Sequence, residues 1–275
     1  MTDFTLEIPR RDPQKVARKA LDASAKIWFL VAAIGQLIFA IYIAAFYGGT
    51  ALRGNWEAWN KALIHGFIPG ETMGNIAVGT HMLLAFIITV GGILQLVPKI
   101  RTQAPVFHRW NGRLYMATAF ILSIGGIYMI LDRGTLGGLA QHIAIVFNAV
   151  LIMAFAIIAL RRVMRGDIKS HRKWALRLFL AVGGVWFFRV GFMLWMLVHG
   201  APVGFDPKTF SGPFLYFLAF GQYLIPLAVL ELYFRAQGRV SALHRFSVAG
   251  LVFSLTILMT VGIFGATMGM WLPRL

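Results

Sequence analysis

The chain has no cysteine and few charged residues, and both absences limit what the protein can be. Without cysteine, the 275 residues form no disulfide, no thiolate-held iron–sulfur cluster and no thiol nucleophile. Asp, Glu, Lys and Arg make up 13% of the chain and 59% is hydrophobic, whereas soluble domains carry about 25% charged residues. So few charges cannot cover the surface of a water-soluble fold of this size. The composition therefore excludes a soluble enzyme and a disordered chain and indicates a protein of the lipid bilayer.

Seven apolar stretches are long enough to cross the roughly 30 Å of bilayer hydrocarbon, which takes about 20 helical residues. A polar segment of about 26 residues precedes the first apolar stretch and is too long for the start of a typical signal peptide. The first apolar stretch is therefore expected to stay in the mature protein as a span. We predict an all-α polytopic integral membrane protein with seven transmembrane helices. Residues 1–26 would form a basic cytoplasmic N-terminal tail, and 27–275 a single transmembrane domain. The predicted spans are 27–48, 76–97, 114–131, 142–160, 174–198, 213–234 and 247–271.

The positive charges orient this bundle. Of the 26 Lys and Arg residues, 20 fall in the tail and in the loops after spans two, four and six, and five fall on the opposite side. Cytoplasmic loops carry such an excess, so the N-terminus is expected inside and the C-terminus outside, in a bacterial inner membrane. The net charge of +16 then faces anionic lipid, and nucleic acid is not an expected partner. Expected partners are the bilayer, other membrane subunits or a redox protein.

Spans two to five contain an internal repeat, about 76–131 and 137–198. The first unit carries His81 and then the segment HRWNGRLY from His108; the second carries His142 and then HRKWALRLF from His171. The repeat predicts a duplicated helical hairpin that forms a four-helix core. Its topology would pair His81 with His142 near the outer face and His108 with His171 near the inner face.

Paired imidazoles on facing helices are suited to axial ligation of haem iron. Haem propionates need cationic partners, which Arg109, Arg113, Arg172 and Arg177 could supply on the inner side and Arg189, inside span five, on the outer side. We therefore predict one or two b-type haems with His81, His142, His108 and His171 as iron ligands. Simpler explanations stay open: interfacial histidines, arginines placed only by topology, and an ion pair of Arg189 with Asp132. Other polar residues in spans are expected to form interhelical hydrogen bonds: Gln95, Asn148, Gln222 and Glu231.

This pattern of histidines and arginines resembles two families. The segment His108-Arg109-x-x-Gly112-Arg113-x-Tyr115, with its flanking histidines, is similar to an uncharacterised family of predicted bacterial membrane proteins over about residues 76–195. The histidine arrangement over spans two to five also resembles cytochrome b561, a transmembrane di-haem electron carrier. That resemblance implies that spans two and four hold one haem and spans three and five the other. The spacings of 27 and 29 residues within each repeat and the seventh span differ from that family.

Three functions follow as hypotheses. The first is cytochrome-b561-like transmembrane electron transfer, a possible membrane oxidoreductase activity. The second is a cofactor-free accessory or assembly subunit of a larger membrane complex. The third is a small-molecule transporter, which the parallel repeat and the few acidic residues in the spans disfavour. No constellation for catalysis of the soluble type is present, so no catalytic residue is predicted.

Overall fold

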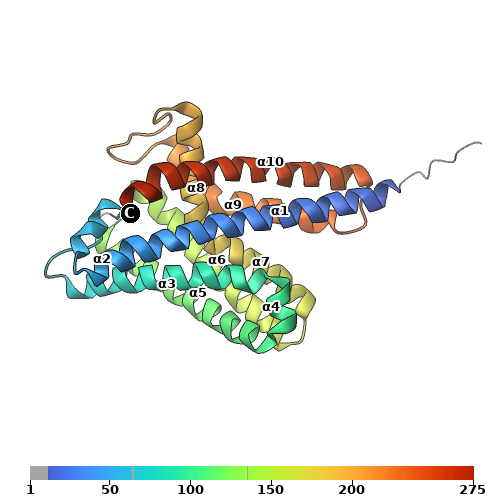
Figure 1. Cartoon of the computed structure of the whole chain (residues 1–275), viewed down its shortest axis with the longest axis horizontal. Helices are drawn as coiled ribbons and strands as arrows, with labels where there is room; N and C mark the ends of the chain where they lie inside the picture. Colours follow the sequence, from blue (N-terminus) through green and yellow to red (C-terminus); the bar gives the residue numbers. More distant parts are fainter. Residues whose placement is uncertain (1–11, 64, 135) are drawn as a thin grey trace, which may run out of the picture.

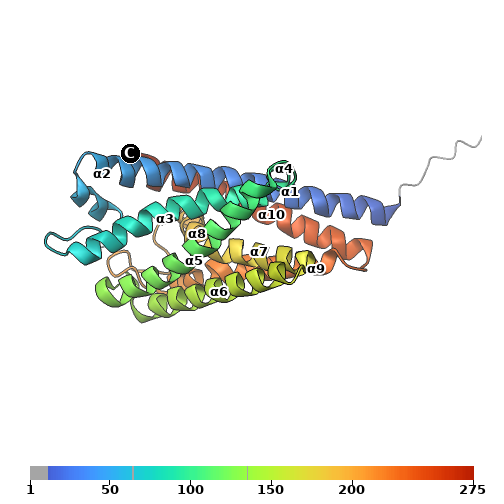
Figure 2. The same cartoon turned by 90° about the horizontal axis from the view of Figure 1, so that it is seen from below.

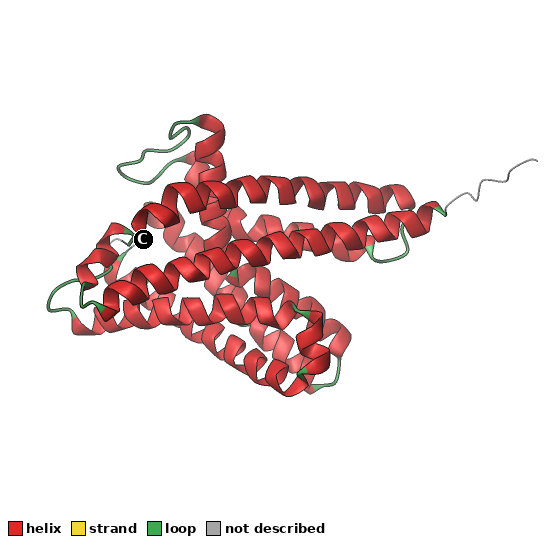
Figure 3. Cartoon of the chain, in the orientation of Figure 1, coloured by secondary structure: helices red, strands yellow, loops and turns green. Residues whose placement is uncertain are grey.

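The computed structural model describes residues 12–63, 65–134 and 136–275, and these are helical apart from connecting loops and one isolated β-bridge (Figure 3). The first eleven residues of the predicted tail lie outside the described residues. The elements in order are α1 Pro13–Tyr42, the π-helical η1 Ile43–Gly48, α2 Gly49–Leu52, η2 Trp56–Lys61, α3 Thr72–Leu96, α4 Pro98–Gln103, α5 Pro105–Arg133, α6 Gly138–Met164, α7 Ile168–Val182, α8 Gly184–His199, α9 Pro213–Ala236, α10 Ala242–Ala266, the π-helical η3 Thr267–Trp271 and η4 Leu272–Arg274.

Local signals in the sequence account for where the long helices begin. The side chains of Asp12, Asp167 and Ser241 cap α1, α7 and α10 by accepting hydrogen bonds from backbone N–H groups of the first turn. Proline occupies the first position of α1, α4, α5 and α9, where its missing N–H costs nothing. The first helix starts inside the segment expected to be a tail, because Leu21 is buried in a cluster with Ala236 of α9 and Val248 of α10.

Among the described residues, six helices are long and apolar enough to cross a membrane, and the number is seven if the bent pair α7–α8 forms one span. The predicted span 174–198 is therefore not straight: α7 and α8 meet at an angle of 52° beside Gly183 and Gly184. A glycine pair is a common site for such a kink. Asn148 of α6 donates from Nδ2 to the carbonyl of Ala181 at 3.1 Å, which satisfies a backbone acceptor at the bend.

The helices form two groups that share α8 and α9 between them (Figures 1 and 2). In one group, α3 packs on α5, α5 on α6 and α6 on α7. In the other, α1 and α10 run side by side, and α8 packs against α10. The first group contains the predicted repeat and has a shared core contributed by α3, α5, α6 and α7.

The segments that are rich in Lys and Arg gather at one end of the molecule, as their alternation along the chain predicts. The start of α1, helix α4, the α6–α7 turn and the α9–α10 turn all lie at one end, on the right in Figure 1. Between the two ends the surface is apolar; on α1, Leu30, Ile34 and Ile41 are 59%, 51% and 62% exposed. Exposed apolar side chains at helical spacing belong in lipid, so the arrangement is that of a polytopic membrane protein.

Candidate functional site

The four histidines of the repeat occupy related positions in the four-helix group. One buried cluster at its centre takes residues from all four helices. Residues seven apart share one face of a helix. Three of the histidines precede a residue of this cluster by seven positions, and the fourth precedes one by fourteen. The pairs are His81 and Ile88, His108 and Tyr115, His171 and Leu178 and, two intervals apart, His142 and Ala156. All four histidines therefore lie on the core-facing sides of their helices.

Two hydrogen bonds set the depths of these histidines relative to one another. Gln95 donates from Nε2 to the carbonyl of His108 at 2.9 Å, and the Nδ1 of His171 lies 2.9 Å from the carbonyl of Ala159. The 14 residues from His81 to Gln95 rise about 21 Å, and the 17 from His142 to Ala159 about 26 Å. The outer and inner pairs are thus more than 20 Å apart along the helices, as the sequence predicts.

A cavity of about 1220 Å³ lies between the two helix groups; we call it the inner cavity because it contains the inner histidines, and it extends outward as far as Leu218 of α9 and Met259 of α10. Its wall is mostly apolar and includes Trp28 and Phe29 of α1 and Tyr233 of α9. His108 of α5 and His171 of α7 both line it, and the two rings lie within electrostatic range of each other. The structure therefore places both inner histidines on the wall of one cavity, although α5 and α7 each pack on α6 and at most slightly on each other.

The repeated sequence motif builds much of this wall. In the first unit His108, Arg109, Gly112, Arg113 and Tyr115 all line the cavity. In the second unit the residues 63 positions later do the same, and they are His171, Arg172, Ala175, Leu176 and Leu178. The two halves of the repeat face one shared space, so the motif marks a site.

Several polar atoms at the cavity have unfilled hydrogen-bonding capacity. Nδ1 of His108 and the hydroxyl of Tyr115 are buried and have no hydrogen-bond partner in the described protein. A carbonyl only accepts, so His171 donates from Nδ1 to Ala159, and in the neutral ring the lone pair is then on Nε2. Histidines that bind metals are commonly oriented by such a bond to a backbone carbonyl.

The predicted cationic residues divide into three sets. Arg109, Arg113 and Arg172 line the cavity, together with Arg101 of α4. Arg177 is instead held by an ion pair of 2.7 Å with Glu231 of α9, with its guanidinium over the ring of Trp174. Arg189 lies in the outer half, on α8.

The outer pair differs from the inner one in that neither His81 nor His142 lines the inner cavity. His81 of α3 lies within electrostatic reach of Arg189, and its buried Nδ1 has no hydrogen-bond partner. His142 is partly buried on α6. Helices α3 and α6 each pack on α5, and their packing against each other is slight at most. Joint ligation by His81 and His142 across the bundle stays a prediction.

Three of the four polar residues expected to join helices do so. Gln95 bonds to α5, Asn148 to α7, and Glu231 pairs with α7, whereas Gln222 bonds to the carbonyl of Ala219 in its own helix. The alternative ion pair of Arg189 with Asp132 does not form. Oδ2 of Asp132 lies 3.9 Å from Nε of Arg133 instead.

Some cavity residues were not singled out as site residues from the sequence. Tyr115 belongs to the motif, so the motif was a usable signal for its role. The aromatic residues of α1 and Arg101 of α4 gave no such signal, because they join the cavity only through packing between distant segments.

Fold and site define a polytopic helical membrane protein with a cavity that both copies of the repeat motif help to line. Residues 78–225 match the family described as predicted membrane protein (DUF2306), and the chain belongs to this family. The match contains all four histidines of the repeat and Arg189, and it confirms the expected uncharacterised membrane family. Neither the curated proteins nor the solved structures include a match to the chain.

Proposed function

We propose that the protein transfers electrons across a bacterial inner membrane through a b-type haem held in the inner cavity by His108 and His171. The observation that carries the proposal is that both copies of the motif line one cavity and contribute a histidine each. A second haem between His81 and His142 remains part of the proposal, in keeping with the cytochrome b561 resemblance.

The residues at the cavity fit a haem. The volume of about 1220 Å³ exceeds the roughly 300–1,000 Å³ of ordinary small-molecule pockets. The apolar wall suits a macrocycle, and the inner arginines suit its carboxylates. Ala175, one turn beyond His171, is a small residue of the cavity wall, and Gly112, one turn beyond His108, leaves room for the side chain of Gln95.

Each group of the chain would have a distinct task. The bond from His171 to the carbonyl of Ala159 would leave Nε2 to hold the haem iron, and His108 is tied to α3 through Gln95. Arg109, Arg113 and Arg172 would neutralise carboxylates at the cytoplasmic edge, and the apolar wall would exclude water. When bound, a haem with two histidine ligands supplies reversible one-electron exchange, with a potential set by burial and hydrogen bonding.

The test is an absorption spectrum of the full chain, purified in mild detergent from haem-replete cells, oxidised and then reduced with dithionite. We expect a Soret band that shifts on reduction. His108→Ala and His171→Ala should each lower the haem content by one per chain. His199→Ala, an exposed histidine at the end of α8, is the matched control and should leave the content unchanged.

A colourless wild-type protein, or inner-pair variants with full haem content, would refute the proposal. Size-exclusion profiles show whether a variant is still folded. A colourless protein that co-purifies with other membrane subunits would favour the accessory-subunit hypothesis instead.

A further inference from the structure

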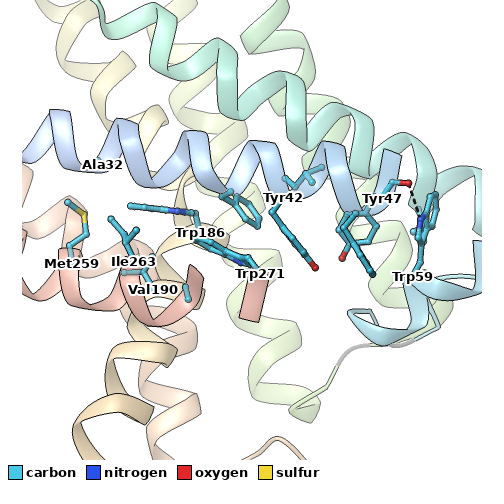
Figure 4. Close-up of a cluster of buried hydrophobic side chains, with 14 residues drawn as sticks. Ala32, Tyr42, Tyr47, Trp59, Trp186, Val190, Met259, Ile263 and Trp271 are labelled. Carbon is cyan, nitrogen blue, oxygen red and sulfur yellow. Dashed lines mark hydrogen bonds between the residues drawn. The ribbon is translucent and has the colours of Figure 1, made fainter. Parts of the chain in front are cut away.

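The outer half of the molecule contains a second cluster of aromatic and polar side chains, which adjoins the inner cavity at Val190 and Met259. Aromatic rings from α1, α8 and the π-helical segments η1 and η3 pack in a row between α1 and α10 (Figure 4). Tyr42 lies 6.4 Å from Trp271 and 6.0 Å from Tyr47, centroid to centroid. The guanidinium of Arg189 lies 5.3 Å from the ring centroid of Phe39.

This outer aromatic cluster has several hydrogen-bond donors and few acceptors. The Nε1 atoms of Trp186 and Trp271 and Nδ1 of the neighbouring His81 are buried without a hydrogen-bond partner in the described protein. The buried hydroxyl of Tyr42 lies within hydrogen-bonding reach of Tyr47, from which it can accept while it donates elsewhere. An indole N–H can only donate, and a hydroxyl or imidazole can donate as well. Buried donors without partners are costly, so this group calls for an acceptor.

The charge at the cluster is also uncompensated. Arg189 bonds to the carbonyl of Val185 in its own helix, and no carboxylate of the described residues forms an ion pair with it. Its electrostatic neighbours are Tyr42, Tyr47 and another cation, Arg274. A positive charge inside a span normally faces a partner of opposite sign.

The backbone around the cluster is unusual as well. Residues 43–48 and 267–271 are both π-helical, and they carry Tyr47 and Trp271. Such segments are rare and occur frequently at functional sites. Two of them, contributed by the first and last spans, flank the same unpaired donors.

We propose that the outer aromatic cluster binds a carboxylate group, with Arg189 as its cation and Trp271, Trp186 and Tyr42 as hydrogen-bond donors. A carboxylate is an acceptor with a single charge, and the planar guanidinium matches it. The surrounding rings suit an apolar body attached to it. Such a group has two sources here, a fatty acid of the bilayer or a haem propionate, and only the second depends on the proposed haem.

The experiment measures binding of laurate by thermal unfolding of the full chain in phosphatidylcholine nanodiscs. Protein from haem-deficient cells is used for this arm, so that its outcome is independent of the inner site. We expect laurate to raise Tm and dodecanol, which has the same chain without the charge, to have no effect. Arg189→Gln should weaken laurate binding at least tenfold, while Arg53→Gln, an exposed outer arginine, should leave it unchanged.

Trp271→Phe keeps a ring and removes one donor, so it should weaken binding by a smaller factor and tests the site without removing charge. Haem content is measured in parallel in haem-replete cells. A loss of haem in Arg189→Gln without laurate binding to the wild type would assign the carboxylate to a haem propionate. Equal stabilisation by dodecanol, or laurate binding and haem content that are both independent of Arg189, would overturn the proposal.

Discussion

Asp167 stabilises the first turn of α7, from which His171 reaches the inner cavity. It caps α7 four residues before His171, and its own carbonyl accepts the backbone N–H of His171 at 2.9 Å. Hydrogen bonds from the hydroxyl and N–H of Ser170, with the charge of Arg162 adding to them, lower the pKa of Asp167. The charged cap therefore stabilises the turn from which His171 reaches the cavity.

This lowered pKa predicts a pH dependence of stability. Because the folded-state pKa is below the usual value of about 3.9, the stabilisation is complete above that value and is lost as the pH falls through the folded-state pKa. Asp167→Asn keeps a capping acceptor without the charge. We expect the Tm of the wild type to fall more steeply than that of the variant below about pH 4; parallel curves between pH 6 and 3 would contradict this.

At the scale of helices, close approach depends on glycines that the hydrophobic pattern does not reveal. A Cβ on Gly262 of α10 would lie 2.5 Å from the carbonyl oxygen of Val190 in α8, and one on Gly35 of α1 would lie 2.7 Å from the ring of Trp186. Small residues let membrane helices approach closely and gain packing energy. These glycines hold α1, α8 and α10 around the outer aromatic cluster.

Gly262→Ala should therefore destabilise the protein, since α8 must move away from α10 to relieve a contact with backbone. Overpacking of this kind costs about 1–3 kcal/mol. Gly250→Ala in the same helix is the control, because a Cβ there meets nothing within 4 Å. It should be neutral or stabilise by up to about 1 kcal/mol. Denaturant titration in detergent measures both, and equal effects of the two substitutions would refute the explanation.

At the scale of the whole molecule, the basic segments gather at one end (Figure 1), and the part of the inner cavity that His108 and His171 line lies toward that end. If that end faces the cytoplasm, the inner cavity is reached from the cytoplasmic leaflet and the outer aromatic cluster lies in the opposite leaflet. The orientation of the chain thus determines from which side each site exchanges ligands or electrons.

The absence of cysteine makes this orientation directly testable. Thr102→Cys in α4 and Thr209→Cys in the α8–α9 loop each introduce a single exposed thiol. The two positions are expected on opposite sides of the membrane. In intact spheroplasts a membrane-impermeant maleimide should label position 209 at once and position 102 only after permeabilisation. The cysteine-free parent is the blank, and the reverse pattern would invert the topology.

Helical spans, their order and the repeat could be predicted from the sequence, because bilayer thickness sets span length and duplicated segments keep their spacing. The motif residues His108 to Tyr115 were likewise visible as a candidate site. The 52° bend at Gly183 was not, since a glycine pair permits a bend but does not require one. Nor was the pairing of Arg177 with Glu231, because several cations and few acids allow many pairings.

Hydropathy, charge asymmetry and sequence repeats depend only on the order of the residues. The sequence therefore determines a membrane helix bundle without any knowledge of tertiary contacts. The cavity and the outer aromatic cluster depend on which distant faces meet. Trp28 reaches the inner site, and Trp271 reaches Tyr42 from the far end of the chain, only after the helices have packed. Such contacts result from the competition of many side chains for the same space, which no single segment encodes.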